Sequence, residues 1–203
     1  MTISEGHRER LREVVREAAA AEFLEKGYTA ASIETIIRRA GGSKSKIYTY
    51  FGGKEGLFIE VVTESCPKTL QPLRDLTFES QDVATALESF GNAFLKAILA
   101  PEPIRLLRLV IAESGRFPTL GKTFSEAGPE QATDLLTRHL ARFATDGSFR
   151  RDISPEMAAT LFMDMISRRF QISLLVGALN GLQNEDVAAT VKTAVRIITT
   201  PAG

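Results

Sequence analysis

Apolar residues recur at helical spacing along most of this chain. In residues 8–26 they fall every three or four positions, and Gly27 follows as a helix stop. A second, short helix is predicted to begin at Ser32, a candidate N-cap, and to end at Gly41 and Gly42. The N-terminal part of the chain therefore predicts helices that glycines separate.

Two further helices continue this pattern. Ser43 is placed to cap a third short helix through Tyr50, which Gly52 ends. Lys54 then opens a fourth helix that is predicted to run towards Pro67. The short helices in this part of the chain are thus separated by glycines.

The rest of the chain predicts longer and more apolar helices. Helical periodicity spans residues 82–99 and 104–113, and proline or glycine bounds both segments. Pro129 is placed in the first turn of another helix, which is predicted to reach the Asp146-Gly147 turn. These segments indicate a helical core.

Two helices are predicted at the C-terminal end. Ser154 and Pro155 begin a segment that is apolar nearly all round as far as Val176, so we expect it to be buried on most sides. Asn184 is placed to cap a last, amphipathic helix. No segment alternates like a strand, so the predicted fold is all-α.

The charges of the chain cluster locally. The 25 basic and 25 acidic residues balance, so net charge favours no partner. Between Glu34 and Glu55, however, there is no acidic residue, and the basic residues there are Arg38, Arg39, Lys44, Lys46 and Lys54. This basic segment is a candidate surface for an anionic partner.

Other sequence features exclude several classes of protein. The single cysteine, Cys66, cannot form an internal disulfide, and the N-terminus lacks the apolar core of a signal peptide. We therefore expect a cytoplasmic protein. The apolar run at 172–179 is far shorter than the roughly 20 residues that cross a bilayer, so no membrane partner is expected.

The segment GGSKSKIYTYF, residues 41–51, fits the second half of a helix-turn-helix. Its glycines allow a tight turn, and Ile47 can anchor the following helix inward. Lys54, at the start of the next helix, can clamp a phosphate. Donors and ring edges for bases and phosphates would come from Lys44, Ser45, Lys46, Tyr48 and Thr49.

Residues 27–58 resemble the helix-turn-helix of the tetracycline-repressor (TetR) family. The shared features are the Gly-Tyr turn, the Ala-Gly turn, the Tyr-x-Tyr-Phe run and the Lys-Glu-x-Leu start of the fourth helix. The resemblance implies that Phe51 packs inside. It also implies that DNA contacts come from Ser32, Lys44, Ser45, Lys46, Tyr48, Thr49, Tyr50 and Lys54.

The sequence departs from the family pattern at three positions. Ala31 stands where a capping threonine is usual, Ile37 where a small alanine is usual, and Gly42 where a valine is usual. We expect Ile37 to fill the volume that Gly42 leaves. Otherwise the crossing angle of the two helices, and with it the base preference, would change.

The family resemblance implies two domains and a homodimer on a palindromic operator. Residues 1–54 would form the helix-turn-helix domain and 55–203 a helical effector-binding and dimerisation domain. Since one protomer cannot easily bury both C-terminal helices, the predicted dimer interface comprises Met165, Arg168, Ile172, Val187, Val191 and Val195.

The C-terminal domain is a candidate site for a small-molecule effector that is largely apolar. The alternative is that its apolar side chains are filled core. An arginine could meet one anionic or carbonyl group of the ligand. The candidate lining residues are Phe90, Phe94, Arg105, Arg108, Ile111, Phe117, Phe124, Phe162 and Met165.

No sequence motif indicates catalysis. There is no nucleophile elbow, phosphate-binding glycine loop or metalloprotease motif, and His7 and His139 lack ligand-type neighbours at metal spacing. We therefore expect no cofactor, no metal and no enzyme activity. A ligand-responsive repressor is the favoured hypothesis. The alternatives are a helical enzyme with an anionic substrate and an effector-free DNA-coating protein.

Overall fold

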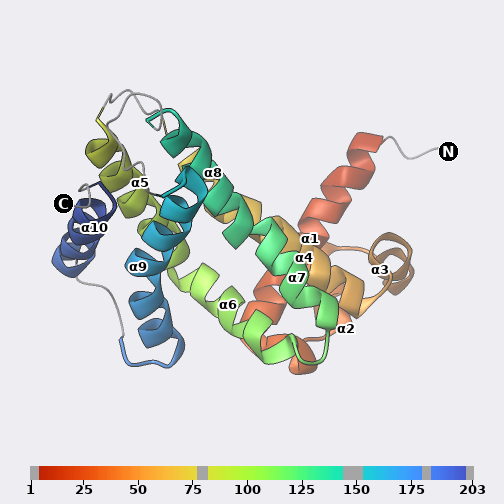
Figure 1. Cartoon of the computed structure of the whole chain (residues 1–203). Coiled ribbons are helices and arrows are strands. Elements are labelled where there is room, and N and C mark those ends of the chain that lie inside the picture. The colour runs from red at the N-terminus through yellow and green to blue at the C-terminus, as the bar shows by residue number, and fades with distance from the viewer. Residues whose placement is uncertain (1–4, 77–81, 144–152, 180–183, 200–203) are drawn as a thin grey trace. The chain divides into compact units, whose positions relative to one another are not determined.

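The computed structural model describes residues 5–76, 82–143, 153–179 and 184–199 (Figure 1). Within these ranges the chain is helical and has no strand, which confirms the all-α prediction. The helices are α1 (Glu5–Ala30), α2 (Ile33–Ala40), α3 (Lys44–Phe51), α4 (Lys54–Arg74), α5 (Val83–Ile98), α6 (Pro101–Glu113), α7 (Pro118–Ala127), α8 (Pro129–Ala141), α9 (Pro155–Leu175) and α10 (Asn184–Thr199).

The chain folds into two compact units. Unit 1 comprises Met1–Cys66 together with Arg105–Phe124, and unit 2 comprises Pro67–Ile104 together with Ser125–Gly203. Each unit therefore draws on two separate parts of the sequence. The sequence predicted a DNA-binding domain at 1–54 and an effector-binding and dimerisation domain at 55–203. The division into compact units does not test these functional assignments, which stay a prediction.

Unit 1 has an aromatic core. Gly27 breaks α1 as the sequence predicted, because its φ of 76° and ψ of 168° are not helical. Just beyond this break, the ring of Tyr28 lies 5.0 Å from the ring of Phe58 and 4.8 Å from that of Phe117, centroid to centroid. Phe23 stacks on the same group. Edge-to-face and tilted rings at these distances attract one another beyond the effect of burial.

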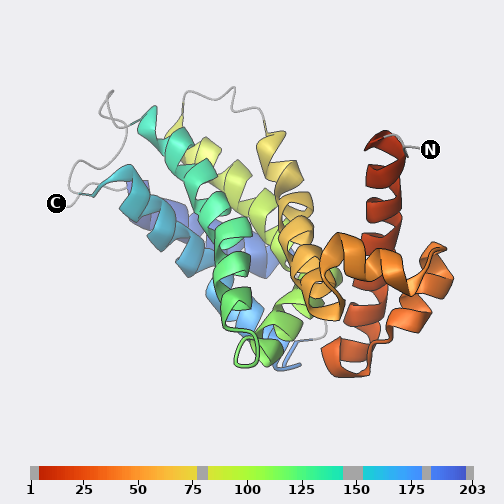
Figure 2. The same cartoon turned by 90° about the vertical axis from the view of Figure 1, so that its right-hand side faces the viewer.

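Unit 2 is built around contacts of α9 and α10 with their neighbours. α9 packs against α8, α5 and α10, and α10 also packs along α5 (Figures 1 and 2). Gly91 of α5 permits the close approach. A Cβ added there would come 2.9 Å from Phe162 Cζ and 3.0 Å from Val191 Cγ1. The three helices meet where only a glycine fits.

Two predictions about the helices need correction. α4 does not end near Pro67 but continues through Pro67 and Pro72 to Arg74. Leu70 and Leu73, beyond the first proline, are 3% and 0% exposed, so burial outweighs the lost backbone hydrogen bond. The predicted Asp146-Gly147 turn lies outside the described residues.

The second correction concerns α9, which the sequence predicted to be buried on most sides. Within the single chain it is buried on one face only. Its buried residues, such as Phe162 and Ile166, lie on one face. Another face leaves large apolar side chains exposed, including Met157, Leu161 and Ile172. No described helix is both long enough and apolar enough to span a bilayer.

Candidate nucleic-acid interface

The Ser32 cap and the glycine turn between α2 and α3 are as the sequence predicted, but the predicted cap by Ser43 is wrong. Ser32 caps α2, because its hydroxyl accepts a hydrogen bond from the Thr35 amide at 3.4 Å. At the other end the Gly41 amide donates to the Ile37 carbonyl at 2.9 Å, with a φ of 67°. Ser43 occupies the N-cap position of α3, but its side chain makes no capping hydrogen bond.

α3 divides cleanly into a buried and an exposed face. Ile47 and Phe51, four residues apart, are 1% and 6% exposed and anchor the helix inward as predicted. Tyr50 is half-buried. The residues that face solvent are Lys44, Ser45, Lys46, Tyr48 and Thr49. The predicted DNA-contacting side chains of α3, apart from Tyr50, thus share an exposed polar surface.

Ile37 and Gly42 lie beside the same small cavity. The space has a volume of about 10 Å³ and is also lined by Ile47 and Phe51. A cavity of this size holds at most one water molecule. Gly42 itself is exposed, however, and a Cβ added there would meet no atom within 4 Å, so the compensation predicted for Ile37 is not seen.

Glu34 is a member of this surface that the sequence did not single out. Its carboxylate accepts from the Ser32 hydroxyl at 3.0 Å and from the Lys44 ammonium at 3.0 Å. A hydrogen bond from its own backbone N–H, followed by those from Lys44 and Ser32, lowers the pKa of Glu34 to about 2. Two predicted DNA-contacting residues therefore already hold an anionic group.

Lys54 is partly held by the last residues of α1, in the turn beyond the break at Gly27. Its ammonium donates to the Thr29 carbonyl at 3.2 Å and lies 4.7 Å from the centroid of the Tyr28 ring. Burial, and then the positive charge of Arg116, lowers the pKa of Lys54. The lysine is thus positioned at the start of α4. Its ammonium group has further N–H donors that could bind a phosphate.

Arg116 and Phe117 belong to the segment Arg105–Phe124, which is distant in sequence, and both contact Tyr28 in unit 1. The Arg116 guanidinium carbon lies 5.2 Å from the Tyr28 ring centroid, and Phe117 is 7% exposed against the same ring. Cation–aromatic and ring–ring contacts of this kind stabilise the turn that holds Lys54. The sequence carried no signal for this contact, because the partners lie far apart along the chain.

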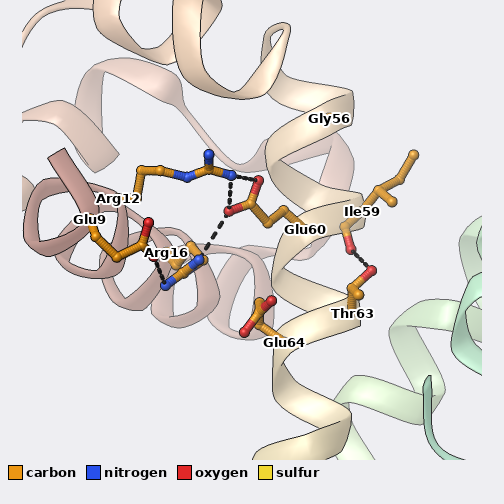
Figure 3. A pocket seen from close by; sticks show the side chains of 8 residues that line it. All are labelled: Glu9, Arg12, Arg16, Gly56, Ile59, Glu60, Thr63 and Glu64. Atoms are coloured by element: carbon orange, nitrogen blue, oxygen red, sulfur yellow. Dashed lines mark hydrogen bonds and ion pairs between the residues drawn. The ribbon is translucent and has the colours of Figure 1, made fainter. Parts of the chain in front are cut away.

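A network of ion pairs braces α1 against α4. Figure 3 shows Arg12 and Arg16 of α1 converging on Glu60 of α4, at 2.8 Å and 3.1 Å. Burial alone would lower the pKa of Arg16, but hydrogen bonds to Glu13 and Glu60 more than offset this and raise it. Carboxylates therefore accompany both guanidinium groups.

These side chains line an open groove of about 510 Å³ between the two helices. Glu9, Thr63 and Glu64 complete its polar walls (Figure 3). Since its cations are already paired, we assign the groove a bracing role that fixes the direction of α4 within unit 1.

Buried Glu22 joins α1 to α2. Its side chain is 3% exposed, accepts from the Ser32 amide at 3.3 Å and pairs with Arg39 at 3.4 Å. A buried carboxylate is costly unless it is paired in this way. The sequence analysis missed Glu22, although spacings of seven residues from Val15 and three from Ala19 place it on the buried face of α1.

The residues predicted to line a ligand site are divided between the two units. Phe90, Phe94 and Phe162 lie in the core of unit 2, and the first two rings are 6.3 Å apart. Met165 is on the exposed part of α9. The remaining candidates belong to unit 1: Arg105, Arg108, Ile111, Phe117 and Phe124. Phe117 has a structural role there, and Ile111 is 57% exposed.

The residues predicted to form a dimer interface also differ in exposure. Val191 and Val195 are 0% and 3% exposed within the single chain, where they belong to the core of unit 2. Met165, Arg168 and Ile172 are exposed, and Val187 is half-buried. The chain thus already covers two of the six residues.

Two protein-family profiles match the chain. The profile for bacterial regulatory proteins of the tetR family matches residues 15–61, and the profile for the C-terminal domain of AefR-like transcriptional repressors matches residues 85–200. With the exposed helix-turn-helix surface, these matches define a DNA-binding transcriptional regulator. The chain belongs to the TetR family.

Relatives and solved structures agree with this assignment. The chain is 24% identical over 167 residues to the HTH-type transcriptional regulator YdgC of Bacillus subtilis, covering 79% of each protein. A TetR-family regulator from Mesorhizobium loti has the same fold, with a TM-score of 0.86, 24% identity and coverage of 94% of this chain and 95% of that one. The flavonoid-responsive regulator FrrA has a TM-score of 0.76 and 28% identity, covering 93% and 95%.

Proposed function

We propose that the protein is a repressor that binds a palindromic operator as a homodimer and leaves it when a small, largely apolar effector binds. The exposed polar face of α3 carries this proposal, because a short helix anchored by Ile47 can enter a major groove and present donors to bases. The proposed DNA-contacting residues are Ser32, Lys44, Ser45, Lys46, Tyr48, Thr49, Tyr50 and Lys54.

The proposal gives the two parts of the chain different functions. Residues 1–54 would read DNA, and residues 55–203 would bind the effector and form the dimer. The match to AefR-like repressors supports repression rather than activation. Deleting the gene should raise transcription from promoters that the protein occupies, and a fall in transcription would instead identify an activator.

Substitutions at Lys54 and Thr49 test the DNA interface. Lys54→Ala should weaken binding to all duplexes alike and reduce the salt dependence by about one unit per protomer, because a phosphate contact is lost. Thr49→Ala should change the preference among sequences, because this side chain faces the bases. Fluorescence anisotropy over a series of salt concentrations measures both effects.

Lys68→Ala is the matched control, since it removes the same charge from an exposed position on α4 that lies outside the proposed DNA-reading residues 1–54. A Lys54→Ala protein whose salt dependence equals that of the control would contradict the clamp assignment.

The proposed dimer uses the exposed apolar face of α9. Met157, Leu161, Met165 and Ile172 share this face, because spacings of four and seven residues return to the same side of a helix. An apolar stripe of this kind on a helix is a candidate for burial against a second copy. Arg168 lies on the same face, and Val187 of α10 completes the proposed set.

Ile172→Asp should convert the dimer to monomers and reduce operator affinity sharply, because the side chain is 54% exposed in the single chain. Its fold should survive the change. Sedimentation velocity at micromolar concentration measures the oligomeric state. Thr160→Asp, exposed on another side of α9, adds the same charge and should leave the dimer intact. A wild-type monomer under these conditions would refute the proposal.

The proposed effector is a largely apolar, aromatic molecule. The similarity to flavonoid-responsive FrrA supports such a ligand. A thermal-shift screen of flavonoids should find compounds that raise the melting temperature and also release DNA. Stabilisation by polyanionic nucleotides alone would contradict this proposal.

A ligand can act on DNA binding without touching DNA. The two base-reading helices of a dimer must lie about one DNA turn, ~34 Å, or a multiple of it apart. α4 belongs to unit 1 up to Cys66 and to unit 2 from Pro67, as one continuous helix. We propose that an effector which shifts α4 changes the separation of the two reading helices and so abolishes the fit.

A further inference from the structure

The carboxylate of Glu34 occupies two groups of the proposed DNA interface. Ser32 Oγ donates to Glu34 Oε2 at 3.0 Å, and Lys44 Nζ donates to Glu34 Oε1 at 3.0 Å. The side chains of Lys44 and Glu34 are 60% and 68% exposed, so the pair lies on the open surface of the module. Each carboxylate oxygen thus holds one side-chain donor.

The Glu34 carboxylate is bound by the same kinds of group that bind a DNA phosphate. A DNA phosphate also presents two oxygens with a negative charge, and hydroxyl and ammonium groups are its usual partners. Glu34 is the last acidic residue before Glu55, in an otherwise basic segment. Because the pKa of Glu34 is lowered to about 2, the carboxylate stays charged throughout the physiological pH range.

We propose that Glu34 is an internal competitor for DNA phosphate that lowers the affinity of the module for every duplex, whatever its sequence. A phosphate can take the ammonium of Lys44 only after the Glu34–Lys44 contact opens. This inference rests on the proposed function, since it assumes that the α3 surface meets DNA.

The test compares Glu34→Gln, Lys44→Gln and the double variant in the full-length protein. Glutamine keeps the size of the side chain and removes only the charge. Glu17→Gln is the matched control, because Glu17 is exposed on α1 and loses the same charge. The probes are a random-sequence duplex longer than two helical turns and the duplex that wild-type protein selects from a random library.

Glu34→Gln should tighten binding to both duplexes by about two- to fivefold per module, the range expected of an exposed ion pair. Its salt dependence should steepen by about one unit, because Lys44 becomes free to neutralise a phosphate. In the Lys44→Gln background the gain should largely disappear. Circular dichroism should show the same melting temperature for Glu34→Gln and Glu17→Gln.

Three results would overturn the proposal. Glu34→Gln could bind no better than Glu17→Gln, or its gain could persist when Lys44 is already glutamine, which would show that Glu34 does not act through this contact. Weaker binding to the selected duplex alone would show that Glu34 reads a base, as a carboxylate can with cytosine. If wild-type protein binds neither duplex with a salt dependence, the proposed function itself fails.

Discussion

Replacing Val191 by aspartate should cost unit 2 more than about 4 kcal/mol of its free energy of unfolding, since an unpaired carboxylate would be buried. Val191 of α10 is 0% exposed, and its Cγ1 lies beside Gly91 of α5. At this point the two helices approach too closely for a water molecule to solvate the new charge. Urea unfolding followed by circular dichroism at one protein concentration measures the loss.

Ala189→Asp is the control for this experiment. Ala189 is exposed on the same helix, so the same new charge should change stability by no more than about 0.5 kcal/mol. Suppose instead that both variants are equally stable and Val191→Asp is monomeric. Val191 would then lie between protomers, as the sequence alone suggested.

Phe117→Ala should destabilise unit 1 by about 3 to 5 kcal/mol, the usual cost of truncating a buried phenylalanine. The ring is 7% exposed and lies 4.8 Å from Tyr28 and 6.3 Å from Phe58. Its loss would leave a cavity beneath the turn that holds Lys54. Denaturant unfolding gives the free energy, and hydrogen exchange at the Tyr28 amide reports whether the loss is local.

Ile111→Ala is the matched control on the same segment. Ile111 is 57% exposed, so its truncation should cost well under about 1 kcal/mol. Equal costs for the two variants would mean that the segment around Phe117 does not pack on the DNA module in solution.

The sequence predicted features that depend on neighbouring residues. Gly27 ends a helix because its backbone reaches positive φ, and Ser32 caps the next helix because its hydroxyl reaches the Thr35 amide. Ile47 points inward because it is the apolar residue in the middle of a polar helix. Each of these can be read from residues that are neighbours along the chain.

The sequence could not predict features that depend on tertiary contacts. The apolar face of α10 is visible in the sequence, but whether α5 or a second protomer covers Val191 is not. The rule that proline ends a helix failed at Pro67, where burial of Leu70 and Leu73 outweighs it. The pairing of Glu34 with Lys44 depends on the turn geometry that brings α2 and α3 together.

The contribution of Arg105–Phe124 to unit 1 bears on how regulators of this kind can exchange parts during evolution. A crossover after the helix-turn-helix would carry away Tyr28 and Phe58 but leave their partner Phe117 behind in the other parent. Both hybrid products would then have a mismatched aromatic core. The heritable unit of DNA reading in this chain is thus a pair of segments, and a single crossover preserves it only where the exchange falls beyond Phe124.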